Sequence, residues 1–288
     1  IMMIFLSLYT IIDGMFISGF VGTDALSATN MVYPVTSIEM AFSIMIATGG
    51  SAIIAKKLGE GRQKEARSIL TALTILTAVL GVIIAVLSIV FLKPIVYLMG
   101  ASQVQFGYCV TYLGLLSVFV PFFLLETMFQ IFFVTAGRPG LGLIVTMSAG
   151  ITNIVLDYIF MGPLKMGVAG AAFATIASQL ISAILITSTL MLSHSSYKLY
   201  ITHLKIHKNL LLRMLKISVP AAIQTLMYNL PNIPLQYYVN LLGTDTVAAW
   251  SIYSKLEAVF WMVMDSLRNS VTTFAGQNYG AGKNHRII

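Results

Sequence analysis

The sequence predicts an all-α membrane protein, a helical bundle of about eight transmembrane helices. Its residues are 58% hydrophobic and only 9% charged, whereas about 25% of the residues of a soluble domain are charged. A soluble fold cannot hide that much apolar surface, so lipid must be the solvent for most of it. Eight apolar segments are long enough to span roughly 30 Å of hydrocarbon; they lie at about 1–20, 31–55, 68–92, 106–136, 141–161, 168–192, 212–241 and 247–275.

The first span begins inside an apolar run with no charged region or small-residue cleavage site before it, so it is not a signal peptide. We therefore expect its start to be clipped and the chain to be a fragment of a longer protein. Clusters of glycine, proline and polar residues separate the next spans; they lie at Gly22-Thr-Asp, Gly59-Glu-Gly61, Lys93-Pro94, Gly137-Arg-Pro-Gly140, Gly162-Pro163 and Gly243-Thr-Asp. A long polar loop at 193–211 precedes the last two spans.

One segment occurs twice in the chain, at a fixed offset of 221 residues. Gly22-Thr23-Asp24 recurs as Gly243-Thr244-Asp245, and Gly59 and Gly61 recur as Gly280 and Gly282. Six spans fill this period, and an even number means that both copies face the same way across the membrane. We expect a first six-helix lobe at 1–192, an inter-lobe loop at 193–211, and the first two helices of a second lobe at 212–288, with helices nine to twelve missing.

The net charge is +7, and the positions of the basic residues indicate how the chain crosses the membrane. Thirteen of the 17 basic residues lie in alternate loops or at a helix start beside them; they are Lys56, Lys57, Arg62, Lys64, Arg67, Arg138, Lys198, Lys205, Lys208, Arg213, Lys216, Lys283 and Arg286. The positive-inside rule makes these loops cytoplasmic and places the N-terminus in the cytoplasm of a cell-membrane protein. The charge therefore indicates orientation rather than binding to nucleic acid.

Acidic residues inside spans are the main functional candidates, because each costs roughly 2.5–3.5 kcal/mol at a helix centre. Asp13 and Asp157 share a depth of roughly 7–14 Å below the outer surface, and Asn153 lies one turn from Asp157. Two carboxyl groups and an amide can bind sodium or share a proton. The alternative is structural, with Asp13 accepting a loop hydrogen bond and Asn153 bridging two helices.

Other polar residues in the spans are candidates for a substrate cavity. Glu126 and Gln130 lie one turn apart just after Pro121 and share a helix face. Glu126 can meet a cationic substrate or form an interhelical hydrogen bond as a neutral acid, and the same two options apply to Glu39. Three further hypotheses concern the last two spans: Gln224 and Asn229 are cavity candidates there, and Asp265 forms an ion pair with Arg268.

The sequence contains no pattern for catalysis or for metal binding. The lone Cys109 excludes a disulfide framework and a cysteine metal cluster. His203 and His207 have a spacing that suits a metal on a helix, but no carboxylate or thiol lies nearby, so a solvated loop is the better interpretation. We expect neither an enzyme nor a protein with a bound metal or cofactor.

Three motifs resemble the MATE family, the multidrug and toxic-compound extrusion transporters. They run from Asp13 to Leu26, from Asn153 to Asp157, and from Gly276 to Lys283, the last reading Gly-Gln-Asn-Tyr-Gly-Ala-Gly-Lys. The resemblance covers the whole chain, which corresponds to about two thirds of a member. Asp13, Asn153 and Asp157 match polar positions assigned to coupling in some members. The span at 212–241 has no acid, although some members carry a coupling glutamate there.

The resemblance implies export of small organic compounds or drugs, often cationic, in exchange for protons or sodium ions. Two lobes would give alternating access to the pathway, in a monomer surrounded by membrane lipid. Flippases of lipid-linked saccharide precursors share the fold and are the alternative. A flippase would favour a more basic cavity, whereas the helices that would face the pathway carry few basic residues.

Overall fold

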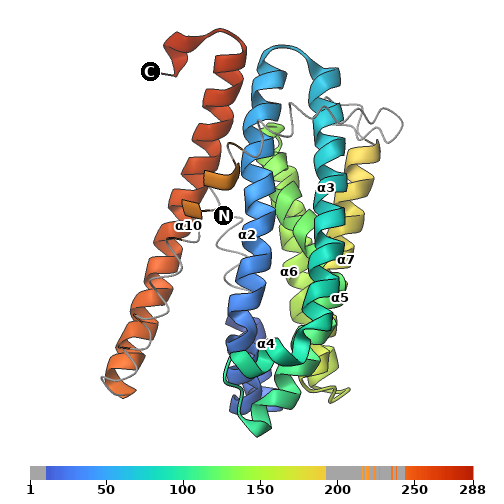
Figure 1. The fold of residues 1–288 in the computed structure, drawn as a ribbon, viewed down its shortest axis with the longest axis vertical. Coiled ribbons are helices and arrows are strands. Elements are labelled where there is room, and N and C mark those ends of the chain that lie inside the picture. The colour runs from blue at the N-terminus through green and yellow to red at the C-terminus, as the bar shows by residue number, and fades with distance from the viewer. Residues whose placement is uncertain are drawn as a thin grey trace.

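The computed structural model describes residues 11–192 and 244–287, together with a few isolated positions between 216 and 238. The described part begins with the helix Ile11–Val21, whose final turn Ile17–Val21 is a π-helix, η1. The helices that follow are α2 (Thr23–Gly59), α3 (Gln63–Val90), α4 (Leu92–Leu98), α5 (Gln103–Thr135), α6 (Pro139–Met161), α7 (Val168–Leu192), α10 (Thr244–Gly280) and the 3-10 turn η3 (Asn284–Arg286). Figure 1 shows the long helices running side by side along the length of the molecule.

The helical fold class is confirmed, because the elements assigned in this part of the chain are all helices. Five helices (α2, α3, α5, α6 and α7) have the length and apolar composition to cross a membrane, and Ile11–Val21 is a shorter apolar helix. The expected span at 212–241 lies almost wholly outside the described residues. The expected span at 247–275 lies within α10, which is not one of the five, and which carries Lys255 and Arg268 as well as three acids.

Local sequence explains where several of these helices begin and end. Ser102 starts α5 with a capping box: its hydroxyl accepts from the backbone N–H of Gln105, whose side chain accepts from the backbone N–H of Ser102. Pro139 occupies the first turn of α6, where no N–H is needed. The short helix α4 is a difference from the sequence analysis, which predicted only a turn at Lys93-Pro94. Proline tolerates the first turn of a helix, so Pro94 is compatible with α4.

The two long helices α2 and α10 correspond through the sequence repeat. Both have 37 residues; α2 begins at Thr23 and ends at Gly59, and α10 begins at Thr244 and ends at Gly280. The C-terminal boundary of α10 is therefore that of α2 moved by the 221-residue offset, and Thr244, the first described residue of α10, is the counterpart of Thr23. The wider expectation, that residues 12–62 superpose on 233–283, stays a prediction, because most of 233–243 lies outside the described residues.

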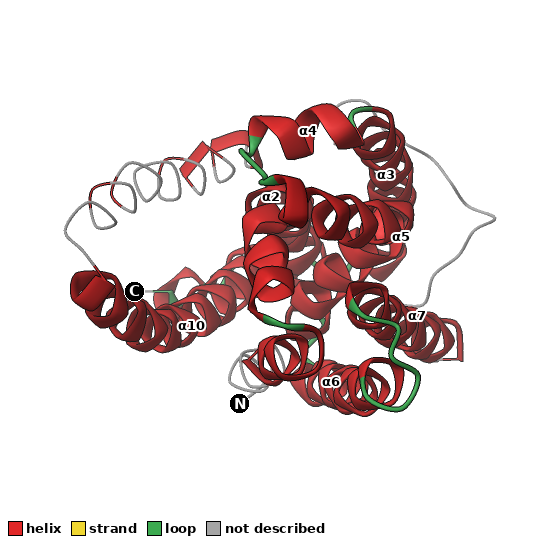
Figure 2. Ribbon diagram, turned by 90° about the horizontal axis from the view of Figure 1, so that it is seen from below, coloured by secondary structure: helices red, strands yellow, loops and turns green. Residues whose placement is uncertain are grey.

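The core of the first lobe forms around α5, which packs against α2, α3 and α7. Figure 2, seen along the bundle, shows α5 between these neighbours. The Ser43 hydroxyl of α2 donates to the Leu124 carbonyl of α5 at 2.6 Å. Gly81 of α3 lies against the backbone of Pro121, since a Cβ built on Gly81 would be 2.6 Å from the Pro121 Cα. These contacts hold α2 and α3 close to α5.

The outward faces of the helices are apolar. On α3, Val79, Val82, Val86 and Val90 are each more than half exposed, and their spacing places them along one face of the helix. Such a continuous apolar face requires an apolar surrounding. The chain is an integral membrane protein with several membrane-spanning helices.

The bundle has two chemically different ends. We call the end formed by the turns at 59–63, 135–139 and 280–284 the basic end, because Lys56, Lys57, Arg62, Arg138 and Lys283 gather near these turns. It is the upper end in Figure 1. The opposite end holds α4 and the turn between α6 and α7.

Candidate functional site

The structure brings together the two acids that the sequence analysis paired. Asp13 lies on the helix Ile11–Val21, and Asp157 lies one turn before the end of α6. Their side chains lie within hydrogen-bonding reach of each other. Asp157 is fully buried and Asn153 is 2% exposed. We call Asp13, Asn153 and Asp157 the acid-pair site; it lies in the half of the first lobe away from the basic end.

Several side-chain oxygens of the acid-pair site have no hydrogen-bond donor among the described residues. Neither carboxylate oxygen of Asp157 has a partner among the described residues, and the same holds for Oδ1 of Asp13 and Oδ1 of Asn153. Two ionised carboxylates are acceptors only, so their proximity becomes a hydrogen bond only when one of them carries a proton. An unpartnered charge pair at this depth would be costly. The geometry therefore suits a shared proton or a cation that the oxygens surround.

Thr175 of α7 belongs to the same polar group and was missed by the sequence analysis. The Asn153 amide Nδ2 donates to Thr175 Oγ1 at 3.4 Å. This bond connects α6 to α7 and leaves the Asn153 carbonyl oxygen free to face an ion or a proton donor. A threonine in an apolar helix has no distinctive sequence pattern, because its hydroxyl often bonds to the backbone of its own helix.

Aromatic rings hold the first helix against α6 beside the acid-pair site. The ring of Tyr158, next to Asp157, lies 6.3 Å from the ring of Phe16 and 6.1 Å from the ring of Phe20, between centroids. Phe16 and Phe20 are themselves 5.7 Å apart. Such tilted and edge-on pairs are favourable arrangements of aromatic rings. They fix the relative position of the two helices that carry Asp13 and Asp157.

Glu126 and Gln130 lie at a different level of the lobe. Glu126 is within reach of Gln130 on its own helix and of the fully buried Ser182 on α7, although the Ser182 hydroxyl makes no bond of good geometry. Counted along α5 and α6, Glu126 is roughly 13 Å closer to the basic end than Asp157 is. Glu126 is therefore separate from the acid-pair site, and its substrate role stays a prediction.

The remaining cavity candidates are placed less favourably or lie outside the described residues. Glu39 of α2 is 4% exposed and accepts a 3.4 Å hydrogen bond from Ser88 of α3. This interhelical bond within the lobe favours the structural alternative for Glu39. Gln224 is exposed, and Asn229 lies outside the described residues, as do His203 and His207.

The ion pair expected near the end of the last span is confirmed. Arg268 Nη2 lies 3.2 Å from Asp265 Oδ1, and both side chains are about half exposed. Nearby, Trp261 Nε1 donates to Glu257 Oε1 at 3.2 Å. Glu257 thus accepts a hydrogen bond from one turn along its own helix.

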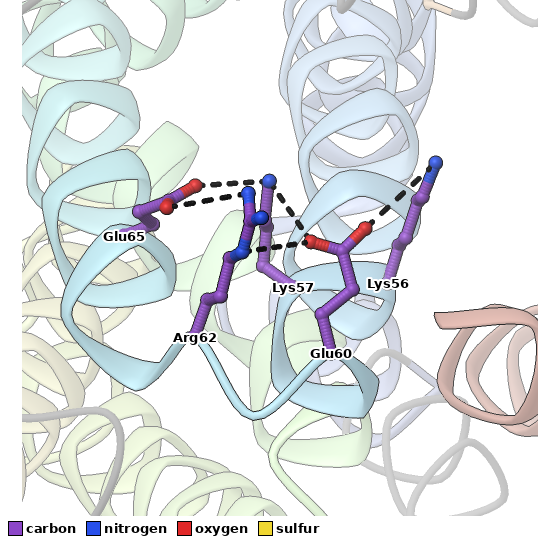
Figure 3. A network of polar contacts seen from close by, with 5 residues as sticks. All are labelled: Lys56, Lys57, Glu60, Arg62 and Glu65. Atoms are coloured by element: carbon purple, nitrogen blue, oxygen red, sulfur yellow. Dashed lines mark hydrogen bonds and ion pairs between the residues drawn. The ribbon is translucent and has the colours of Figure 1, made fainter. Parts of the chain in front are cut away.

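A network of ion pairs shapes the turn between α2 and α3 at the basic end (Figure 3). Lys57 lies 3.0 Å from Glu60 and 2.9 Å from Glu65, and Arg62 reaches the same two carboxylates at 3.7 and 3.5 Å. The hydrogen bond from Lys57 lowers the pKa of Glu60 below its ordinary value. Each exposed pair contributes little alone, but the shared partners make the turn one connected unit.

The acid-pair site offers at most two carboxylates to a metal. Across residues 11–192 and 244–287, no three His, Cys, Asp or Glu residues gather closely enough to hold a metal ion. Two carboxylates with an amide oxygen are hard ligands, of the kind that a proton or a small alkali cation takes. Reversible binding of such an ion is the chemistry that this arrangement supports.

A family profile described as MatE matches residues 1–159 and 220–287. The curated relatives include a probable multidrug resistance protein, YoeA, of Bacillus subtilis, 25% identical over 280 residues, covering 95% of this chain and 60% of the relative. A FAD transporter of Shewanella oneidensis is 27% identical over 300 residues, with coverage of 96% and 62%. The multidrug export protein MepA of Staphylococcus haemolyticus is 24% identical, with coverage of 96% and 61%.

Solved structures share the fold. A transporter of the MOP superfamily from Pyrococcus furiosus superposes with a TM-score of 0.92 at 22% identity, covering 99% of this chain and 64% of its own. A MATE transporter in the bent conformation gives a TM-score of 0.90 at 21% identity, with the same coverage. The chain thus spans less than two thirds of the length of these relatives. The names given to these relatives describe transporters or drug resistance, not enzymes.

Proposed function

Because the chain belongs to the MatE family, the multidrug and toxic-compound extrusion transporters, we propose that it forms part of a secondary active multidrug exporter. The exporter exchanges protons or sodium ions for organic compounds, chiefly cationic ones, by alternating access. This activity belongs to the whole protein, of which the chain spans about three fifths by the length of its curated relatives. In the exporter the basic end faces the cytoplasm, and the N-terminus lies on that side of the cell membrane.

The acid-pair site is the observation that carries this proposal. Asp13 and Asp157 face each other inside the first lobe, and Asp157 has no hydrogen-bond donor among the described residues. A proton or a sodium ion stabilises such a pair by removing the repulsion between its charges. The site then exists in a loaded and an empty form, and each form can favour a different orientation of the lobes.

Coupling follows if ion binding and drug binding favour opposite states. An ion that enters the acid-pair site from outside stabilises one arrangement of the first helix against α6, where the Phe16, Phe20 and Tyr158 rings make contact. Release of the ion to the cytoplasm restores the charged pair. The ion gradient can drive export only if the acid-pair site binds the ion with different affinity in the two orientations of the lobes.

A cationic substrate is supported by the charges on the described helices. Arg268 is paired with Asp265, so its charge is compensated. Glu126 supplies a carboxyl group in the first lobe. A lipid-linked pyrophosphate would need a basic cavity, so these charges do not favour the flippase. One relative is named a FAD transporter, which makes an anionic substrate the competing outcome for the experiment below.

The test is export of ethidium by the full-length product of the gene, in everted membrane vesicles. Either an imposed proton gradient or an imposed sodium gradient should drive accumulation of the dye, while the other should not. Vesicles without the protein are the control. Accumulation of FAD but not of ethidium would reject the cationic substrate class, and no gradient-driven movement of either would reject the exporter.

A further inference from the structure

The helices α2 and α10 cross at the basic end with their backbones in direct contact. A Cβ built on Gly59 would overlap the carbonyl oxygen of Gln277, and a Cβ built on Gly280 would overlap the carbonyl oxygen of Lys56. One turn away, a Cβ on Gly276 would lie 2.9 Å from the Cβ of Ala55. We call these six residues the glycine crossing. Only glycine lets two helices approach this closely without a side chain between them.

The glycine crossing is reciprocal. In the 221-residue repeat, Gly59 corresponds to Gly280, and Lys56 corresponds to Gln277. Gly59 packs on the carbonyl of Gln277, and its counterpart Gly280 packs on the carbonyl of Lys56, which is the counterpart of Gln277. A contact between i and j that is matched by one between their counterparts is what a two-fold relation produces. The two copies thus present the same surface to each other at this point.

Further contacts between α10 and the first lobe lie at the same end. Gln277 Nε2 donates to the Thr135 carbonyl at the end of α5, at 3.1 Å. Lys56 Nζ lies 5.1 Å from the centre of the Tyr279 ring. Away from this end the two helices separate, as Figure 1 shows. Ala55 has no exposed surface, and Gly276 of α10 lies against its Cβ.

We infer that the glycine crossing is the gate that closes the basic end of the pathway, and that it separates during each transport cycle. This inference rests on the proposed function, since a gate requires a pathway that opens alternately to the two sides. In the closed state the two backbones form the seal. A methyl group at position 59 or 280 enters the space of the opposing carbonyl and holds the seal apart. Such a variant favours the state that is open at the basic end.

The first experiment measures the seal without measuring transport. In the full-length product, Cys109 is replaced by alanine and Ala55 by cysteine, which gives one reporter thiol that the closed gate covers. A membrane-impermeant maleimide is applied from the basic side of oriented vesicles. Gly59→Ala and Gly280→Ala should each accelerate labelling about tenfold or more, because overpacking shifts the population toward the open state.

Gly140→Ala is the matched control. Gly140 lies in the first turn of α6 at the same end, and a Cβ there would meet nothing within 4 Å. This variant should leave labelling unchanged. The inference is overturned if Gly59→Ala and Gly280→Ala label at the same rate as Gly140→Ala. This measurement also stands if no dye is exported, so failure of the gate and failure of the exporter are distinguishable.

The second experiment asks whether the crossing must open. Ala55→Cys and Gly276→Cys together place two thiols on facing positions, with Cβ atoms 2.9 Å apart. A disulfide needs about 3.5–4.5 Å between these atoms, so a small separation of the helices accommodates the cross-link. Oxidation should form the cross-link and stop dye export, and reduction should restore it. In each single-cysteine variant the export rate before and after the same oxidation should be equal, whatever that rate is. Cross-linked protein that exports at the uncross-linked rate would show a permanent joint instead of a gate.

Discussion

Lys56 of α2 and Tyr279 of α10 form a cation–π contact, with Nζ 5.1 Å from the ring centre. They do not correspond in the repeat, since the counterpart of Lys56 is Gln277 and that of Tyr279 is Leu58. This contact therefore has no symmetric counterpart, unlike the two glycine–carbonyl contacts of the glycine crossing. An exposed cation–π contact contributes about 0.5–1 kcal/mol.

We predict that Tyr279→Leu weakens the closed state and that Tyr279→Phe does not. The leucine variant should label Ala55→Cys about two- to fivefold faster with the impermeant maleimide, because the ring that attracts Lys56 is lost. The phenylalanine variant keeps the ring and tests whether the hydroxyl matters. Equal labelling in both variants would show that the ring does not attract Lys56.

We predict that Asp157→Asn abolishes gradient-driven export, because the amide keeps the shape of the side chain and removes its charge. Asp13→Asn should do the same or shift the pH profile between about pH 6 and 8, since the pair then holds only one titratable group. Dye export in everted vesicles is the measurement. Asp24→Asn is the control, because Asp24 is an exposed acid in the first turn of α2. Export at the unsubstituted rate by either pair variant would assign the acids a structural role.

We predict that Gly81→Ala destabilises the first lobe. Its new methyl group would lie 2.6 Å from the Cα of Pro121, and overpacking of this kind costs about 1–3 kcal/mol. The apparent Tm of purified protein in detergent should fall. Gly107→Ala, in the same bundle but with nothing within 4 Å of its new methyl group, should leave the Tm unchanged or raise it slightly. A Tm that falls equally in both variants would show that the contact with Pro121 is not the cause.

We predict that the turn between α2 and α3 loses its ion-pair support in acid. Lys57 lowers the pKa of Glu60, so this carboxylate stabilises the folded turn above its unfolded pKa. The contribution is lost as the pH falls through the lowered pKa. Lys57→Met should therefore lower the apparent Tm at pH 7 and make a smaller difference near pH 3. A Tm difference that does not change with pH would show that Lys57 acts by packing.

Periodicity and apolar length predicted much of the fold. The expected spans between residues 31 and 192 coincide with helices, and so does the described part of the first span. A segment without water must satisfy its backbone within the helix. The short helix α4 was not predictable, since seven residues give too little periodic signal. The expected start of the second span at residue 31 was eight residues late. Helix α2 begins at Thr23, in a polar segment that the search for apolar spans did not include.

The acid-pair site was predictable because burial of charge is costly wherever it occurs. Equal expected depth in two spans was enough to pair Asp13 with Asp157. Thr175 was not predictable, since its contact with Asn153 depends on the rotation of α7 about its axis. The placement of Glu39 against Ser88 depends in the same way on how α2 and α3 face each other. A hydropathy pattern contains no information on such rotations.

The seal at the glycine crossing has a consequence for how a duplicated gene can change. Gly59 and Gly280 press on main-chain carbonyls, which every residue type provides, so the residues that bear those carbonyls are free to differ. They do differ, as Lys56 in one copy and Gln277 in the other. Each copy can thus acquire its own side chains for ions, drugs or partners while the joint between them keeps its geometry. Divergence of the two halves is then limited at two glycines and permitted beside them.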